Sequence, residues 1–134
     1  MIRRRPSFPG LPRPTDTELA ILRILWRLGP STVRDVVGEL NREQETGSTT
    51  ALKMLQIMTE KGLVRREAAG RQHVYEPSVS EEATQAQLVE HLLDRAFGGA
   101  AHKLVLQALA TQKASATELA EIRRLLTRIE KESQ

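Results

Sequence analysis

Residues 48–77, STTALKMLQIMTEKGLVRREAAGRQHVYEP, decide the fold of this chain, because a helical pattern changes there into an alternating one. In the first half the apolar residues recur at the spacing of one helical face, which predicts a helix over residues 48–61. In the second half, segments 63–67 and 72–76 read as strands joined by a turn at 68–71. A two-stranded hairpin is marginal by itself in water, so it must rest on helices elsewhere in the chain.

Two shorter helices are predicted upstream of this stretch. Thr15 and Glu18 have the spacing of a capping box, and the apolar pattern that follows is ended by the Gly-Pro pair at 29–30. A second helix is predicted from Ser31 or Thr32 to about Asn41. Three helices followed by a hairpin is the order of a winged helix, a variant of the helix-turn-helix in which the third helix enters the major groove.

The chain after the hairpin is predicted to be helical to its end, so the fold class is mainly α. Segments 80–97 and 100–111 carry apolar residues at helical spacing, and a third helix begins with a capping box of Ser115 and Glu118. We therefore divide the chain into an arm (1–14), a winged-helix domain (15–79) and a helical domain (80–134).

The helices of the last domain are amphipathic and follow a domain that is already complete. Their apolar faces can meet across a two-fold axis, which predicts a homodimer, or they can simply extend the core of a monomer. The candidate dimerisation residues are Leu88, Leu92, Leu93, Leu104, Leu119, Ile122, Leu126 and Ile129.

Composition limits the class of protein. Of the 134 residues 40% are hydrophobic but only 3% are aromatic, so the core must be aliphatic. There is no cysteine, which excludes disulfides and thiolate metal sites. No apolar run is long enough to span a membrane and no signal peptide is visible, so we expect a cytoplasmic protein.

The formal net charge of +3 is unevenly distributed. Residues 1–14 contain four arginines, four prolines and no acidic residue, and we interpret them as a flexible basic arm. Such an arm is either a leader without a role or a segment that touches phosphates. Residues 15–79 contain nine basic and nine acidic residues, so a polyanionic partner would have to be recognised by a local arrangement of charge.

The predicted third helix and hairpin carry the candidate DNA-binding residues. Hydroxyls at a helix N-terminus suit phosphate and base-edge contacts, glutamine can pair with an adenine edge, and arginine neutralises phosphates. The same hydroxyls would otherwise serve as helix caps, and the same arginines would only keep a hairpin solvated. The candidates are Ser48, Thr49, Thr50, Lys53, Gln56, Arg65, Arg66 and Arg71.

The sequence does not indicate an enzyme. His73, His91 and His102 are scattered, and no two of them have the spacing of neighbours on one helical face. No nucleophile, phosphate-cradling glycine motif or metal-ligand spacing is present, so we expect no catalytic residue, no cofactor and no metal.

Residues 14–109 resemble the penicillinase-repressor family of bacterial transcription regulators, the BlaI/MecI/CopY group. The matching segments are PTDTELAILRILW, STVRDVVGEL, STTALKMLQIMTEKGLV, RREAAGRQHVYEP and LVLQAL. The resemblance implies a homodimeric repressor that binds palindromic operators through an N-terminal winged helix and dimerises through C-terminal helices. It places Thr49, Thr50 and Lys53 at recognition-helix positions that face DNA, and Arg71 at the arginine after the wing glycine.

This chain differs from the known subgroups at the residues that serve regulation. The antibiotic-responsive members are cut by a protease at an Asn-Phe pair, where this chain has Ala100-Ala101-His102-Lys103, so a regulatory protease stays an open partner. The copper-responsive members use cysteine pairs that this chain lacks. Two alternative functions stay open: a winged helix that docks on another protein, and a small-molecule-responsive regulator with a pocket between its C-terminal helices.

Overall fold

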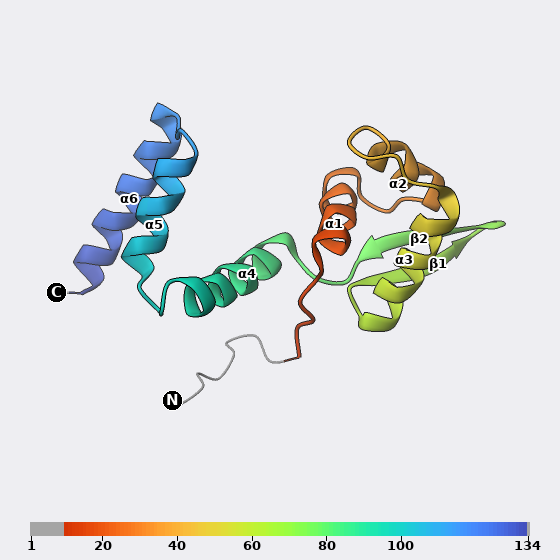
Figure 1. The fold of residues 1–134 in the computed structure, drawn as a ribbon, viewed down its shortest axis with the longest axis horizontal. Coiled ribbons are helices and arrows are strands. Elements are labelled where there is room, and N and C mark those ends of the chain that lie inside the picture. Colours follow the sequence, from red (N-terminus) through yellow and green to blue (C-terminus); the bar gives the residue numbers. More distant parts are fainter. Residues whose placement is uncertain (1–9, 134) are drawn as a thin grey trace. The chain divides into compact units, whose positions relative to one another are not determined.

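The computed structural model describes residues 10–133, which form six helices and one antiparallel pair of strands (Figure 1). Arg3, Arg4 and Arg5 of the predicted arm lie outside the described residues. The elements are α1 (Asp16–Leu28), α2 (Val33–Leu40), α3 (Ser48–Lys61), β1 (Val64–Ala69), β2 (Gln72–Pro77), α4 (Glu81–Ala96), α5 (Ala101–Thr111) and α6 (Ala116–Glu132). This confirms the prediction of a mainly α chain with a winged helix at its N-terminal end.

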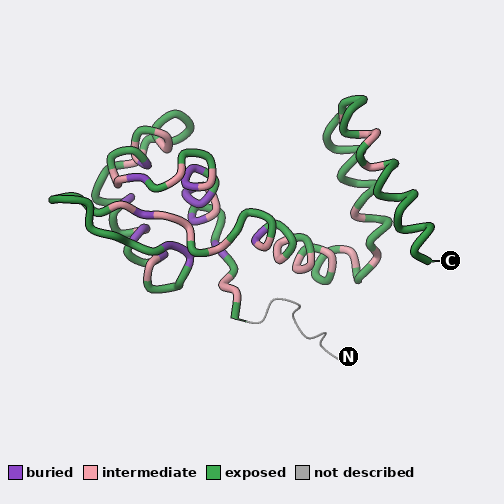
Figure 2. Tube along the Cα trace, turned by 180° about the vertical axis from the view of Figure 1, so that it is seen from behind, coloured by how far each residue is buried: buried purple, intermediate pink, exposed green. Residues whose placement is uncertain are grey.

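The chain divides into two units, the first ending at Glu90 and the second beginning at His91. Nine buried hydrophobic residues of the first unit form one cluster, to which its first three helices and both strands contribute (Figure 2). Its members are Ile21, Leu22, Leu25, Val36, Leu55, Met58, Leu63, Val64 and Tyr75. Eight of these nine side chains are aliphatic, as the composition requires.

The predicted capping boxes are present at both positions. In α1 the amide of Thr15 donates to Oε1 of Glu18 (2.8 Å), and the amide of Glu18 donates to Oγ1 of Thr15 (3.3 Å). Ser115 and Glu118 repeat this arrangement at the start of α6, with distances of 2.9 and 3.1 Å. Each box satisfies two amides that the first turn of a helix would otherwise leave without an acceptor.

Helix α3 ends at a glycine that turns the chain into the hairpin. Gly62 has φ +81°, a left-handed conformation that side chains with a Cβ adopt at a cost. The amide of Leu63 then donates to the carbonyl of Met58 (2.9 Å), which satisfies one of the last carbonyls of the helix. Leu63 and Val64 enter the core directly after this turn, so the start of β1 is fixed against the helices.

The hairpin is longer than the sequence pattern predicts. Its strands run to Ala69 and from Gln72, and these two residues form the last pair before a turn of only two residues. Gly70, with φ +66°, occupies the first turn position, as a type II′ turn requires. Ala68 and Ala69, which the pattern assigns to the turn, therefore belong to β1.

The base of the hairpin is held by a bridge that the pattern does not predict. The amide of Ser31, in the connection between α1 and α2, donates to the carbonyl of Tyr75 (3.0 Å), and the amide of Tyr75 donates to the carbonyl of Ser31 (2.8 Å). Ser31 thus acts as a one-residue third strand, which stabilises a hairpin that would be marginal alone.

The N-terminal half of α4 packs with the first unit. Thr84 is buried, and the side-chain amide of Gln87 donates to the carbonyl of Leu11 (2.7 Å). The indole of Trp26 donates to the carbonyl of Val79 (3.0 Å), just before the helix begins. The described end of the N-terminal segment is therefore bound to this unit, and Pro14 is buried.

The second unit contains the end of α4 together with α5 and α6. No residue of α5 or α6 is buried, as the exposed and intermediate colours of Figure 2 show. Among residues 10–133 no helix combines the length and the apolar character that crossing a bilayer would need.

Candidate nucleic-acid interface

Helix α3 has one buried face and one polar, exposed face. Ala51, Leu55 and Met58 are fully buried in the core of the first unit. Every polar candidate is exposed: Thr49, Thr50, Lys53 and Gln56 lie away from the buried stripe, and Ser48 lies in line with it at the exposed first turn. The sequence periodicity predicts this division, since the buried residues alone have the spacing of an inward face.

The first turn of α3 has no side-chain cap. Its N-cap residue is Gly47, which has no side chain, and Ser48 lies inside the helix. The interpretation of Ser48 as the cap is therefore wrong, because the helix begins one residue earlier than that role needs. The first amides of α3 are left at an exposed helix N-terminus, which carries partial positive charge and favours an anionic partner.

The opposite end of α3 is fixed by an ion pair with the start of α1. Nζ of Lys61 lies 2.6 Å from Oε1 of Glu18, whose side chain is 5% exposed. Burial raises the pKa of the Glu18 carboxyl, but hydrogen bonds from Lys61 and Thr15 and the positive charge of Lys61 outweigh it, so the pKa lies below its ordinary value. Capping explains Glu18 from the sequence, but nothing in the sequence signals a partner 43 residues away.

The hairpin is exposed beyond its base and carries the three candidate arginines. Arg66 and Arg71 are exposed. Arg65 is also exposed, but its Nε donates to Oε1 of Glu76 at 2.5 Å, directly across the ladder. Since α3 packs against β1, the structure brings the helical and the hairpin candidates together in one unit.

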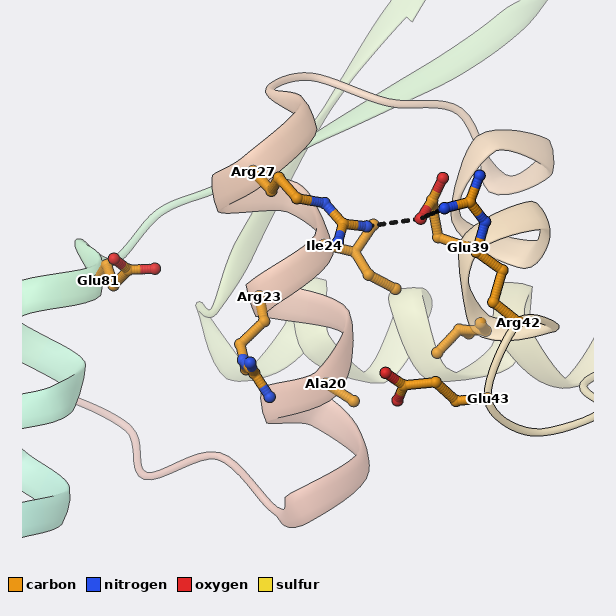
Figure 3. A pocket seen from close by; sticks show the side chains of 9 residues that line it. Ala20, Arg23, Ile24, Arg27, Glu39, Arg42, Glu43 and Glu81 are labelled. Carbon is orange, nitrogen blue, oxygen red and sulfur yellow. Dashed lines mark hydrogen bonds and ion pairs between the residues drawn. The ribbon is translucent and has the colours of Figure 1, made fainter. Parts of the chain in front are cut away.

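A shallow depression of about 430 Å³ lies in the first unit between α1 and α2 (Figure 3). Arg27 and Arg42 approach the carboxylate of Glu39 at its rim, at 2.6 and 3.8 Å. Three of its charged groups are therefore paired with one another, and the depression does not lie between the C-terminal helices, where the alternative of a small-molecule-responsive regulator would need a pocket. Within residues 10–133 no three metal-binding side chains cluster.

The second unit exposes large apolar side chains. From Val89 to Ile129 eight large apolar side chains are exposed, with Leu106 at 64% and Leu126 at 51%, and a high density of such residues is typical of an interaction surface. Among the candidate dimerisation residues Leu92, Leu126 and Ile129 are exposed, while Leu88, Leu93, Leu104, Leu119 and Ile122 are half-buried.

Comparison with known sequences gives the same family by two routes, a family model and an individual relative. The family model described as penicillinase repressor matches residues 14–128. A penicillinase repressor of Bacillus licheniformis is 26% identical over 117 residues, which cover 87% of this chain and 91% of the relative.

Comparison with solved structures agrees at the level of the fold. A MarR family protein from Bacillus stearothermophilus has a TM-score of 0.51 at 16% identity, covering 95% of this chain and 77% of that one. The Bacillus licheniformis BlaI monomeric form, solved in complex with the blaP half-operator, is 27% identical with a TM-score of 0.47. It covers 53% of this chain and 87% of its own.

Proposed function

Because the chain belongs to the penicillinase repressor family, we propose that it is a DNA-binding transcriptional repressor that acts as a homodimer on a palindromic operator. The observation that carries this proposal is the exposed polar face over the first three turns of α3, from Thr49 to Gln56, opposite the buried residues Ala51, Leu55 and Met58. Any surface helix has a polar outer face, but here that face begins at an uncapped N-terminus with hydroxyl groups, an amine and an amide that can bind a nucleic acid.

The start of α3 supports binding of a polyanion. The exposed amides at its uncapped N-terminus and the hydroxyls of Thr49 and Thr50 can donate to phosphate oxygens or to base edges. Lys53 lies one turn further along and adds a positive charge. The side-chain amide of Gln56 has one donor and one acceptor, which match the acceptor and the donor on the edge of an adenine.

The second unit supports the dimer. Exposed apolar residues on α4, α5 and α6 are stabilised by burial against a second copy, which presents the same residues. A dimer would present one α3 from each copy to the same duplex. Because the two copies are related by a two-fold axis, the operator would have the same symmetry. Linking the two binding modules raises affinity through effective concentration.

The proposal is tested by titrating the full chain, over a series of salt concentrations, against duplexes from the region upstream of its own gene. We expect sequence-specific binding to a two-fold site, with log K falling linearly against log salt. The control is the same duplex with one half-site scrambled, which should bind far more weakly. Absence of binding to every upstream fragment at low salt would contradict the proposal.

A protein-docking function is the second candidate, favoured by the equal numbers of basic and acidic residues over 15–79. Reversing the charges of Lys53 and Arg71 separates the two. Loss of DNA binding supports the repressor, whereas unchanged DNA binding with loss of a protein partner supports docking.

A further inference from the structure

We propose that the hairpin meets DNA with only one of its two faces, the one that carries Arg66 and His73, and that Arg65 makes no phosphate contact. This inference rests on the proposed DNA-binding function and divides residues that the sequence treats as equivalent. It also adds His73, which neither the sequence pattern nor the comparisons assign to an interface.

The strand register defines the two faces. Residues paired directly across an antiparallel ladder point to the same side, and successive residues along a strand alternate. The pairs Val64–Pro77, Arg66–Tyr75 and Ala68–His73 therefore share one face. Val64 and Tyr75 are buried, so this is the face by which the hairpin rests on the helices.

The same face packs on the core that the buried side of α3 also enters. Val64 and Tyr75 enter the cluster that Leu55 and Met58 of α3 also enter, so the hairpin and the helix are packed on a common core. Beyond that core this face continues toward the tip with Arg66 and His73, both exposed. In the proposed complex a duplex on the exposed side of α3 also contacts these two side chains, with Arg71 at the turn.

The opposite face has the wrong charge for a phosphate. It carries the pairs Arg65–Glu76, Glu67–Val74 and Ala69–Gln72, hence one arginine and two glutamates. Arg65 is already bonded to Glu76, and Glu67 lies on the same side two residues further along β1. The face with Arg66 carries no acidic residue, so the two sides of the hairpin differ in sign.

Neighbouring residues of the same type supply a matched pair of variants. Arg65→Gln and Arg66→Gln remove the same charge from adjacent positions, so only the face differs. Each is titrated with a short duplex of mixed sequence between about 50 and 200 mM salt, because each phosphate contact contributes about 0.9 to the slope of log K against log salt. We expect Arg66→Gln to reduce the slope by about 0.9 and Arg65→Gln to leave it unchanged.

Three further variants guard against indirect effects. Arg66→Lys should keep the wild-type slope, since it keeps the charge. Glu76→Gln releases Arg65 without touching the other face and should also leave the slope unchanged. His73→Ala should weaken binding about two- to tenfold, as expected for one lost hydrogen bond.

Equal slope losses for Arg65→Gln and Arg66→Gln, or a slope gained by Glu76→Gln, would overturn the assignment of the faces. Those results would leave the proposed repressor function standing, because the wild type would still bind with a steep salt dependence. A wild type that binds no duplex at any salt concentration would overturn both. Thermal melts of each variant identify any that is unfolded, and Arg65→Gln and Glu76→Gln still test the Arg65 face if Arg66→Gln is one of these.

Discussion

The backbone of Tyr75 is hydrogen-bonded, whereas the hydroxyl of its side chain is not. Its backbone is paired with Ser31, its ring is 1% exposed, and its hydroxyl has no hydrogen-bond partner among the described residues. A desolvated hydroxyl without a partner costs free energy. We expect Tyr75→Phe to leave the free energy of unfolding unchanged or to raise it by up to about 1 kcal/mol, as measured by urea denaturation. A clear loss of stability would show that the hydroxyl is satisfied in solution.

Thr50 lies in the exposed first turn of α3, where it is placed to touch a base edge or a phosphate. Thr50→Ala should weaken operator binding by about 1–2 kcal/mol, the range for one lost contact at a specific site. The measurement is a fluorescence anisotropy titration with the identified operator. Thr127→Ala, an equally exposed threonine in α6, should bind as the wild type does. If both variants bind normally, Thr50 does not face DNA.

At the scale of residues, the sequence predicts which side chains of α3 are exposed but not how the hairpin arginines differ. Periodicity fixes the helical face, because the buried and exposed positions repeat along a single element. Cross-strand partners depend instead on the register, and the register depends on the length of the turn. A turn over 68–71 would place Arg65 opposite Val74, whereas the two-residue turn places it opposite Glu76.

At the scale of elements, the pair Glu18–Lys61 ties the start of α1 to the end of α3. We expect Lys61→Met to lower the free energy of unfolding near pH 7 by about 1.5–3 kcal/mol, the range for a hydrogen bond to a charged group. The reason is that the buried carboxylate loses its partner and keeps its desolvation. Lys131→Met, an exposed lysine at the end of α6, should have little effect.

The same pair predicts a dependence on pH. The folded pKa of Glu18 lies below its ordinary value of 4.5, so its stabilising contribution is present above that value and is lost as pH falls through the folded pKa. The difference between the wild type and Lys61→Met should therefore shrink in urea titrations on going from about pH 7 to about pH 3. A difference that is the same at both pH values would assign the effect to the packing of the lysine stem.

Element ends were predictable where a local signal marks them. The capping boxes at Thr15 and Ser115, and the glycine after Lys61, act through neighbouring residues and can be read directly. The bridge between Ser31 and Tyr75 cannot, because a single extended residue has no periodicity and its partner lies 44 residues away. The strand ends were misplaced because alanine is somewhat depleted in strands, so Ala68 and Ala69 gave no strand signal.

At the scale of the whole molecule, the exposed apolar residues of the second unit predict the effect of a charge among them. Leu126→Asp should raise the dissociation constant of the homodimer by about two orders of magnitude or more, because an unpaired carboxylate would have to be buried in the interface. Sedimentation velocity measures the change. Thr127→Asp adds the same charge at the adjacent exposed position as a control.

The first unit should stay folded in Leu126→Asp, since its buried cluster contains no residue of α5 or α6. Operator affinity should then fall, because each copy would bind its half-site alone. A dimer that persists in the variant would place the interface elsewhere on the chain.

The sequence marks a change of pattern at Ser80, where the strand gives way to a helix, whereas the packing changes within α4. That helix is continuous from Glu81 to Ala96, and its first half is held by buried Thr84 and by the bond from Gln87 to Leu11. A pattern along one helix shows that it is amphipathic, but it does not show which partner each turn packs against. That information comes only from the three-dimensional arrangement within the first unit.

The bridge between Ser31 and Tyr75 has a consequence for the thermodynamics of association. A free hairpin that docks on a partner must give up the conformational freedom of its whole length, and that loss opposes binding. Here the base is already immobilised by two backbone hydrogen bonds and a buried ring, so only the few residues nearest Gly70 have freedom left to lose. Folding has therefore already met most of the entropic penalty that engaging a ligand with this hairpin would otherwise incur.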